Sequence, residues 1–374
     1  MIYLDYSANT PVSQEVLERF CYVSQNFTGN PNSAHKAGEQ AKKLQDEITL
    51  SISSQLNVHP EEVIYTSGAT ESNNLAIKGI ARSERHTGKH IITTPLEHPS
   101  VSAPLTALQS QGYEVDMVNI DRSGKVDLEH LRSLLREDTV LFTVCAVDSE
   151  LGTIQPIEGI VNILKNFPNC RLHLDATQAV GKIPFDFSSA DTVSFAPHKF
   201  YGIIGIGVLI KKKHLIIEPL IHGGSSSSIY RSGTPTLALN SATETALKIA
   251  LENQPKRYQK VEKLNSLLRA KLSEYPKVTI NSPADAIPHI LNLSVQGVKG
   301  KAFQQALSEK GVCVSVKSAC STDNLPSRAV FAVSRNRKNA LSSWRISLSH
   351  LTDETELERF IEIFDSCYKE ITSL

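Results

Sequence analysis

The stretch HLDATQAVGKIPFDFSSADTVSFAPHKFYG, residues 173–202, decides the fold of this chain. A short apolar segment predicts a strand that ends on the carboxylate of Asp175, and Gln178 follows three residues later. A second predicted strand, residues 192–196, leads into Pro197-His198-Lys199. Neighbouring strands of this kind direct a carboxylate and an amine into one crevice at the edge of a sheet.

A carboxylate and a lysine in one crevice are the pair that pyridoxal phosphate (PLP) chemistry requires. The lysine holds the aldehyde of the cofactor as a Schiff base, and the acid keeps the pyridine nitrogen protonated so that the ring accepts electrons. The spacing alone fits equally well an aspartate that caps the next helix and a solvated lysine in a loop. Only the rest of the chain separates these two interpretations.

The composition favours a reduced, soluble enzyme. A chain of 374 residues is long for one hydrophobic core, so we expect two unequal domains. The 39 Lys and Arg residues balance the 39 Asp and Glu residues, which disfavours a nucleic-acid or membrane-surface partner. The sequence shows no secretory signal and no apolar run of membrane-spanning length. The six cysteines lack C-x-x-C spacing, which disfavours a metal site and a disulfide framework. We therefore expect a cytoplasmic protein.

Predicted strands and helices alternate through the first two thirds of the chain. Because the strands are almost entirely apolar, we expect an α/β fold with a mainly parallel sheet sandwiched by helices. After Leu237 a long helical stretch, interrupted at Pro255, precedes a smaller α+β domain. We expect residues 14–250 to form the large domain, and residues 1–13 and 251–374 the small one. The strands are predicted at 63–66, 90–94, 115–118, 140–144, 172–175, 192–196 and 207–210.

A turn of small residues, Ser67-Gly68-Ala69-Thr70, joins the first of these strands to a predicted helix. Backbone N–H groups and the helix dipole at such a helix start bind anions. The same pattern also describes an ordinary connection between a strand and a helix. The phosphate site at this turn is therefore predicted from its combination with Lys199.

Motifs along nearly the whole chain resemble the cysteine desulfurase family of fold-type I PLP-dependent enzymes. The resemblance is specific because the motifs occur together, in order and at the family's spacing. They are YLDYSANTP at 3–11, GNPNSAH at 29–35, TSGATESNNLAIKG at 66–79, EHPSV at 97–101, DATQAVGK at 175–182, HKFYG at 198–202, RSGTP at 231–235 and SACST at 318–322.

The resemblance implies roles for individual residues toward PLP. Lys199 would form the Schiff base, Asp175 would pair with the pyridine nitrogen, and Gln178 would hydrogen-bond the ring oxygen. His98 would stack on the ring and help to move protons. The other cofactor contacts would come from Ala69, Thr70, Ser149, His198 and, from the partner subunit of a homodimer, Thr234.

The resemblance also implies the substrate and the product. Arg345 would clamp the carboxylate of L-cysteine, with Asn30 nearby, and the thiolate of Cys320 would attack the substrate sulfur. The products would be L-alanine and a persulfide on Cys320, whose sulfur passes to a protein acceptor, for example in iron–sulfur cluster assembly. The identity of the acceptor and the use of selenocysteine stay open. The other five cysteines are expected to pack in apolar or helical surroundings.

Some positions depart from the family's motifs. Ser149 stands where the family has an asparagine near the ring oxygen, and Ala196 stands where it has a phosphate-binding serine. Pro197 replaces a small residue. We therefore expect this chain to hold PLP more loosely than the family pattern does. The alternatives are a PLP-dependent lyase or aminotransferase of the same fold, and a low-activity paralogue that binds a partner protein.

Overall fold

The computed structural model describes residues 1–224, 228–316 and 325–372. Its main feature is a seven-stranded sheet with the order β2-β8-β7-β6-β5-β3-β4. Within this sheet β8 runs antiparallel to both neighbours, and the other pairs are parallel. The predicted mainly parallel sheet is therefore confirmed. The strands are β2 (Val63–Thr66), β3 (His90–Thr93), β4 (Glu114–Met117), β5 (Thr139–Cys145), β6 (Arg171–Asp175), β7 (Thr192–Phe195) and β8 (Gly207–Lys211).

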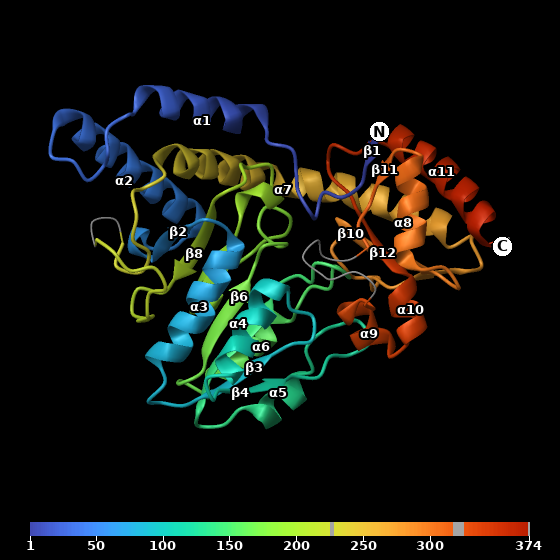
Figure 1. Cartoon of the computed structure of the whole chain (residues 1–374), viewed down its shortest axis with the longest axis horizontal. Helices are drawn as coiled ribbons and strands as arrows, with labels where there is room; N and C mark the ends of the chain where they lie inside the picture. The colour runs from blue at the N-terminus through green and yellow to red at the C-terminus, as the bar shows by residue number, and fades with distance from the viewer. Residues whose placement is uncertain (225–227, 317–324, 373–374) are drawn as a thin grey trace.

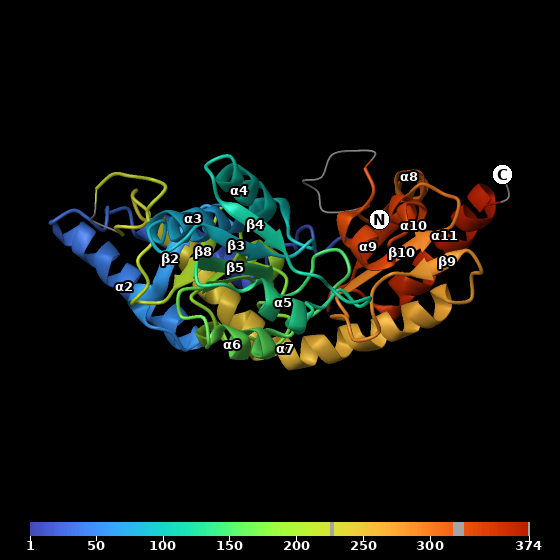
Figure 2. The same cartoon turned by 90° about the horizontal axis from the view of Figure 1, so that it is seen from below.

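Helices cover both faces of this sheet (Figures 1 and 2). Alternate side chains of one strand enter different cores: Ile91 packs with α3 and α4, whereas Ile92 packs with α1, α2, α6 and α7. This two-sided burial explains why the strands read as continuous apolar runs. The helices are α1 (Gln14–Asn26), α2 (Lys36–Leu56), α3 (Ala69–Ser83), α4 (Pro99–Gln109), α5 (Leu128–Leu134), α6 (Ile157–Leu164), α7 (Leu237–Leu272), α8 (Gly300–Glu309), α9 (Arg328–Ser334), α10 (Arg337–Ser342) and α11 (Glu354–Thr372).

A second core lies at the other end of the molecule, beside both termini (Figure 1). It joins Ile2 and Leu4 of the N-terminal segment to the C-terminal half of α7 and to α8 and α11. These separate cores support the division into residues 14–250 and residues 1–13 with 251–374, which stays a prediction. The strands here are β1 (Ile2–Tyr3), β9 (Val278–Ile280), β10 (Ile290–Val295), β11 (Val312–Cys313) and β12 (Ser343–Ser347); β1 pairs with β11, and β10 lies between β9 and β12.

The structure corrects two expectations. Helix α7 continues through Pro255, where an interruption was predicted, and extends from the large sheet into the second core. Proline in a helix interior costs about 3 kcal/mol, but Leu247 and Ala250 before it and Leu264 after it are buried in the two cores, and burying one leucine contributes about 1.5–3 kcal/mol. Burial along α7 thus offsets the proline.

Cys21, expected to be packed, is exposed on α1.

Candidate active site

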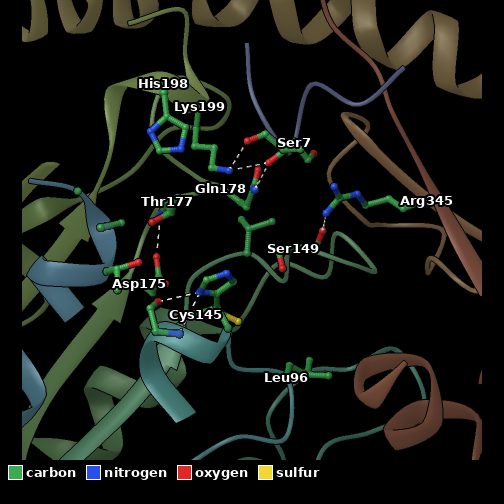
Figure 3. Close-up of a pocket in the computed structure, with 17 residues that line it drawn as sticks. Ser7, Leu96, Cys145, Ser149, Asp175, Thr177, Gln178, His198, Lys199 and Arg345 are labelled. Carbon is green, nitrogen blue, oxygen red and sulfur yellow. Dashed lines mark hydrogen bonds between the residues drawn. The ribbon is translucent and has the colours of Figure 1, made fainter. Parts of the chain in front are cut away.

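A cavity of about 320 Å³ lies at the carboxyl edge of the large sheet, facing the second core. The ends of β5 and β6 contribute to its wall, together with the 3-10 helix that follows β7 and the first turn of α3. Residues 7 and 8 of the N-terminal segment and Arg345 of β12 close it from the other side (Figure 3). The predicted site residues that line this cavity are Ala69, Thr70, His98, Ser149, Asp175, Gln178, His198, Lys199 and Arg345.

Lys199 extends into the cavity from a short 3-10 helix, Pro197–Lys199, that directly follows β7. Its Nζ donates hydrogen bonds to the carbonyl oxygens of Ser7 at 3.0 Å and Ala8 at 2.7 Å. The Gln178 Nε2 donates to the same Ser7 oxygen at 3.0 Å, so both side chains point to one carbonyl (Figure 3). The N-terminal segment therefore orients the amine of Lys199 within the cavity.

The carboxylate of Asp175 is buried and held on both oxygens at the end of β6. Asn73 Nδ2 donates to Oδ2 at 2.8 Å, and the backbone N–H of Thr177 donates to Oδ1 at 3.0 Å. The Asn73 Oδ1 in turn faces His173 Nε2 at 3.0 Å. Because an amide oxygen only accepts, His173 must donate from Nε2. Burial lowers the pKa of His173, which keeps the ring neutral. The chain thus presents a fixed, hydrogen-bonded carboxylate to the cavity.

His98 is the N-cap residue of α4, and this role fixes its ring beside the cavity. Its Nδ1 accepts from the backbone N–H of Ser100 at 3.1 Å and lies 2.8 Å from the Ser100 hydroxyl. Burial lowers the pKa of His98, and the nearby Asp175 opposes this shift while Lys199 adds to it. The ring is therefore neutral at pH 7 and carries its proton on Nε2.

The turn before α3 has the geometry of an anion cradle. Residues 68–70 line the cavity at the N-terminal end of this 15-residue helix, where backbone N–H groups lack helical partners. A Cβ on Gly207 would lie 2.4 Å from the Gly68 carbonyl carbon, so only glycine allows β8 to approach the cradle this closely. The pKa of the nearby His198 is lowered to about 4, mainly by burial and further by the positive charges of Lys199 and Lys182.

Arg345 forms the opposite end of the cavity and is 2 % exposed. Its Nη1 donates to the Ser149 carbonyl oxygen at 2.6 Å, and its Nη2 pairs with Asp5 Oδ1 at 3.0 Å. On β12 the flanking Trp344 and Ile346 face the second core, which turns Arg345 toward the cavity. Nη1 and Nη2 each carry a second N–H beyond the one used in these contacts, and Nε has no hydrogen-bond partner among the described residues, so the guanidinium retains donors for a carboxylate ligand.

Cys320, the predicted nucleophile, lies outside the described residues. The described residues on either side of segment 317–324 are anchored near Arg345. Ser315 forms a β-bridge with Arg345 and donates its hydroxyl to Asp5 Oδ2 at 2.7 Å. On the far side, the Ser327 hydroxyl donates to Glu150 Oε2 at 2.5 Å. Ser315, two residues before this segment, therefore lies beside the predicted substrate clamp Arg345.

Asn30 and Thr234 are not brought to this cavity within one chain. Both line a second cavity, also of about 320 Å³, between α1 and the start of α7. Their predicted roles, substrate contact for Asn30 and phosphate contact for Thr234, therefore require a second subunit. For Thr234 that arrangement was expected from the sequence, whereas Asn30 was expected near Arg345. Both roles stay predictions.

Comparison with known proteins places the chain in a family. Residues 2–360 match the family described as aminotransferase class-V. A Vibrio cholerae protein named cysteine desulfurase IscS is 38% identical over 97% of this chain and 91% of its own length. The chain belongs to the cysteine desulfurase family. A Lactobacillus delbrueckii NifS/IcsS protein homolog is 35% identical over 100% of this chain and 99% of its own.

Solved structures of the family share the whole fold. A structure titled NifS-like protein superposes with a TM-score of 0.93 at 33% identity and covers 100% of both chains. A structure titled SspA in complex with cysteine has a TM-score of 0.82 at 30% identity and covers 93% of this chain and 99% of that one. The predicted fold type I is therefore confirmed.

In residues 1–224, 228–316 and 325–372, no helix has both the length and the apolar character that a membrane crossing requires.

This desulfurase family depends on PLP, and the residues present fit that cofactor. The cavity combines an amine at Lys199, a fixed carboxylate at Asp175 and an anion cradle. The hydroxyl of Thr177, on the cavity wall, is buried and has no hydrogen-bond partner among the described residues. A cofactor with an aldehyde, a basic ring nitrogen and a phosphate matches this set of donors and acceptors.

Several residues that shape the site were not predicted from the sequence. Asn73 lies three residues after Thr70 on α3, so both lie on one face of the helix, and this spacing could have revealed it. Glu97 was noted only as the neighbour of His98; it is buried, and its Oε1 accepts from the backbone N–H of Cys145 at 3.1 Å. No sequence pattern indicates that the carbonyl of Ser7 would orient Lys199.

Proposed function

We propose that the chain is a PLP-dependent cysteine desulfurase. It removes sulfur from L-cysteine, releases L-alanine, and carries the sulfur as a persulfide on Cys320 for a protein acceptor. The observation that carries this proposal is the arrangement of Lys199, Asp175 and Arg345 around one cavity: an amine, a carboxylate and a carboxylate-binding guanidinium. The family membership and the names of the relatives support the same conclusion.

Each residue has a defined task in this proposal. When bound, the cofactor withdraws electrons from the substrate Cα. Arg345 holds the substrate carboxylate through paired N–H groups, which fixes the position of Cα. Lys199 would hold the cofactor and would move the Cα proton with its amine, and neutral His98 would take part in proton transfer from Nε2. The Cys320 thiolate attacks the substrate sulfur, so the sulfur–carbon bond breaks while a sulfur–sulfur bond forms.

The proposed enzyme is a cytoplasmic homodimer. The dimer is supported by the position of Asn30 and Thr234, which line a cavity of their own and would complete the site of a partner subunit. The IscS name of several relatives supports iron–sulfur cluster assembly as the destination of the sulfur. Balanced charge and the lack of a membrane-spanning helix among the described residues agree with a small-molecule substrate and a protein acceptor.

The test is release of L-alanine from L-cysteine by the purified protein with PLP. Lys199→Ala should lose nearly all alanine release and the absorbance of bound cofactor. Lys165→Ala is the matched control, because Lys165 is an exposed lysine whose side chain makes one described hydrogen bond, to Asn162. It should behave like the wild type. Production of pyruvate and ammonia in place of alanine would contradict the proposal and favour a lyase.

A further inference from the structure

Lys182 is a buried lysine directly behind the cavity wall. Its side chain is 8 % exposed, and its Nζ donates to the Gln178 Oε1 at 2.5 Å. None of the ion pairs between described residues includes it. A buried ammonium group without a carboxylate is costly. Its hydrogen bond to Gln178, which lines the cavity, points to a role for this buried charge in shaping the cavity.

The Lys182 contact favours one orientation of the Gln178 amide. A lysine ammonium has three donors and no acceptor, so it must face the oxygen of the amide. The nitrogen of Gln178 then faces the opposite way, where Nε2 donates to the Ser7 carbonyl oxygen and borders the cavity. The Ser7 carbonyl oxygen also only accepts, so it favours the same orientation; without Lys182, that single contact would be left to keep the amide oxygen away from a ligand.

The backbone holds Lys182 in place from the α7 side. Gly181 has φ +73°, and a Cβ there would lie 2.8 Å from the Ala250 Cβ and 3.1 Å from the Phe200 Cβ. The loop can therefore approach α7 closely only with glycine at this position. The Lys182 carbonyl oxygen also accepts from Gln254 Nε2 of α7 at 3.0 Å. A side chain anchored in this way has little freedom to leave Gln178.

Gln178 is the one side-chain amide among the described residues that line the cavity. We propose that Lys182 is a positioning residue that holds the Gln178 N–H group toward the cavity and thereby selects a hydrogen-bond acceptor, the ring oxygen of PLP, at that point. Its positive charge, one hydrogen bond behind the wall, polarises the amide and favours negative charge on that oxygen. Burial, followed by repulsion from Lys199 and Arg345, lowers the pKa of Lys182 to about 7, so this positive charge is fully present below that pH and is lost above it.

This proposal rests on the proposed function, and a double-mutant cycle tests it through PLP binding to apoprotein, without turnover. Lys182→Met should weaken PLP binding by roughly tenfold, because one hydrogen bond to a charged group is involved. If Lys182 acts through Gln178, then adding Lys182→Met to Gln178→Ala should change the affinity by less than about twofold. Additive losses in the double variant, or wild-type affinity in Lys182→Met, would overturn the proposal.

Two further variants separate positioning from folding. Lys211→Met is the matched control: Lys211 is also buried, but it donates to the carbonyl oxygens of Lys212 and Leu215, away from the cavity. It should leave PLP affinity and the absorbance maximum of the bound cofactor unchanged, whereas Lys182→Met should shift that maximum. A Lys211→Met variant that lost PLP affinity to the same extent would show a general effect of removing a buried lysine and would overturn the proposal.

Gln178→Glu keeps the contact with Lys182 but offers no N–H group to the cavity. It therefore tests the amide orientation even if Lys182→Met fails to fold. Its PLP affinity should fall at least as far as that of Gln178→Ala, and wild-type affinity would overturn the proposal. A wild type that binds PLP but releases no alanine would contradict the proposed function alone, whereas additive losses in an active enzyme would contradict only the role of Lys182.

Discussion

The buried carboxyl group of Glu97 should make the stability of the apoprotein fall as the pH rises. Its side chain is 5 % exposed, Oε1 accepts from the Thr94 hydroxyl at 2.7 Å and from the Cys145 N–H, and Oε2 has no partner among the described residues. Burial is the main cause that raises the pKa of Glu97 from 4.5 to about 8, and repulsion by Asp175 and Asp148 adds to it. The folded protein therefore keeps this carboxyl group protonated at pH 7.

The size and sign of the effect follow from proton linkage. Between pH 4.5 and about 8 the folded state binds a proton that the unfolded state has released, so the free energy of unfolding decreases as the pH rises. The decrease begins near the unfolded pKa and is complete above the folded pKa. One pH unit corresponds to about 1.36 kcal/mol, so the total is at most roughly 5 kcal/mol. Glu97→Gln removes this ionisation.

The assay is urea unfolding of the apoprotein across this pH range. At about pH 5 the Glu97→Gln variant should be close to the wild type, and above about pH 8 it should be more stable by several kcal/mol. Glu252→Gln, which changes an exposed glutamate on α7, is the matched control and should follow the wild-type curve. Parallel curves for Glu97→Gln and the wild type would refute the buried, neutral carboxyl group.

Three further predictions concern substrate, cofactor and subunit contacts. Arg345→Lys should raise the KM for L-cysteine roughly ten- to a hundredfold with a smaller change in kcat, because lysine loses the paired contact with the carboxylate; an unchanged KM would remove Arg345 from substrate binding. Ala196→Ser should tighten PLP binding by up to about tenfold in a titration of apoprotein, since it restores the hydroxyl that the family's motif has at this position, and equal affinity would mean that the phosphate needs no further donor. Mixed dimers of Thr234→Ala and Lys199→Ala subunits should retain one undamaged site with wild-type PLP affinity; damage at both sites would contradict a shared site.

The sequence predicted the parts of the site that depend on strand ends. Asp175 and Lys199 follow neighbouring parallel strands, β6 and β7, so their approach follows from the fold alone. Contacts between distant segments could not be predicted from the sequence. Residue 7 contacts Lys199 only because the N-terminal segment packs into the second core. In the sequence, Lys182 looks like an ordinary charged surface residue. Its burial behind the Gln178 amide depends on how closely its loop packs on α7, which no local pattern predicts.

The continuity of α7 and the placement of Asn30 show two other limits of the sequence. A proline within a helical pattern normally predicts a break, and only burial in two separate cores keeps α7 continuous through Pro255. The loop that carries Asn30 lines a cavity with α1 and the start of α7, apart from the cavity that holds Arg345. Long-range packing of this kind is not encoded in a local pattern.

The central claim is that sulfur moves from L-cysteine to Cys320. The most direct measurement is the intact mass of the PLP-loaded protein after a single turnover with L-cysteine and no acceptor, together with the L-alanine released. We expect the chain to gain one sulfur atom, located on the peptide that contains Cys320, with one alanine released per sulfur bound. Cys320→Ser should still bind PLP but gain no sulfur and release almost no alanine. Undiminished alanine release by Cys320→Ser, or sulfur bound on another cysteine, would contradict the account.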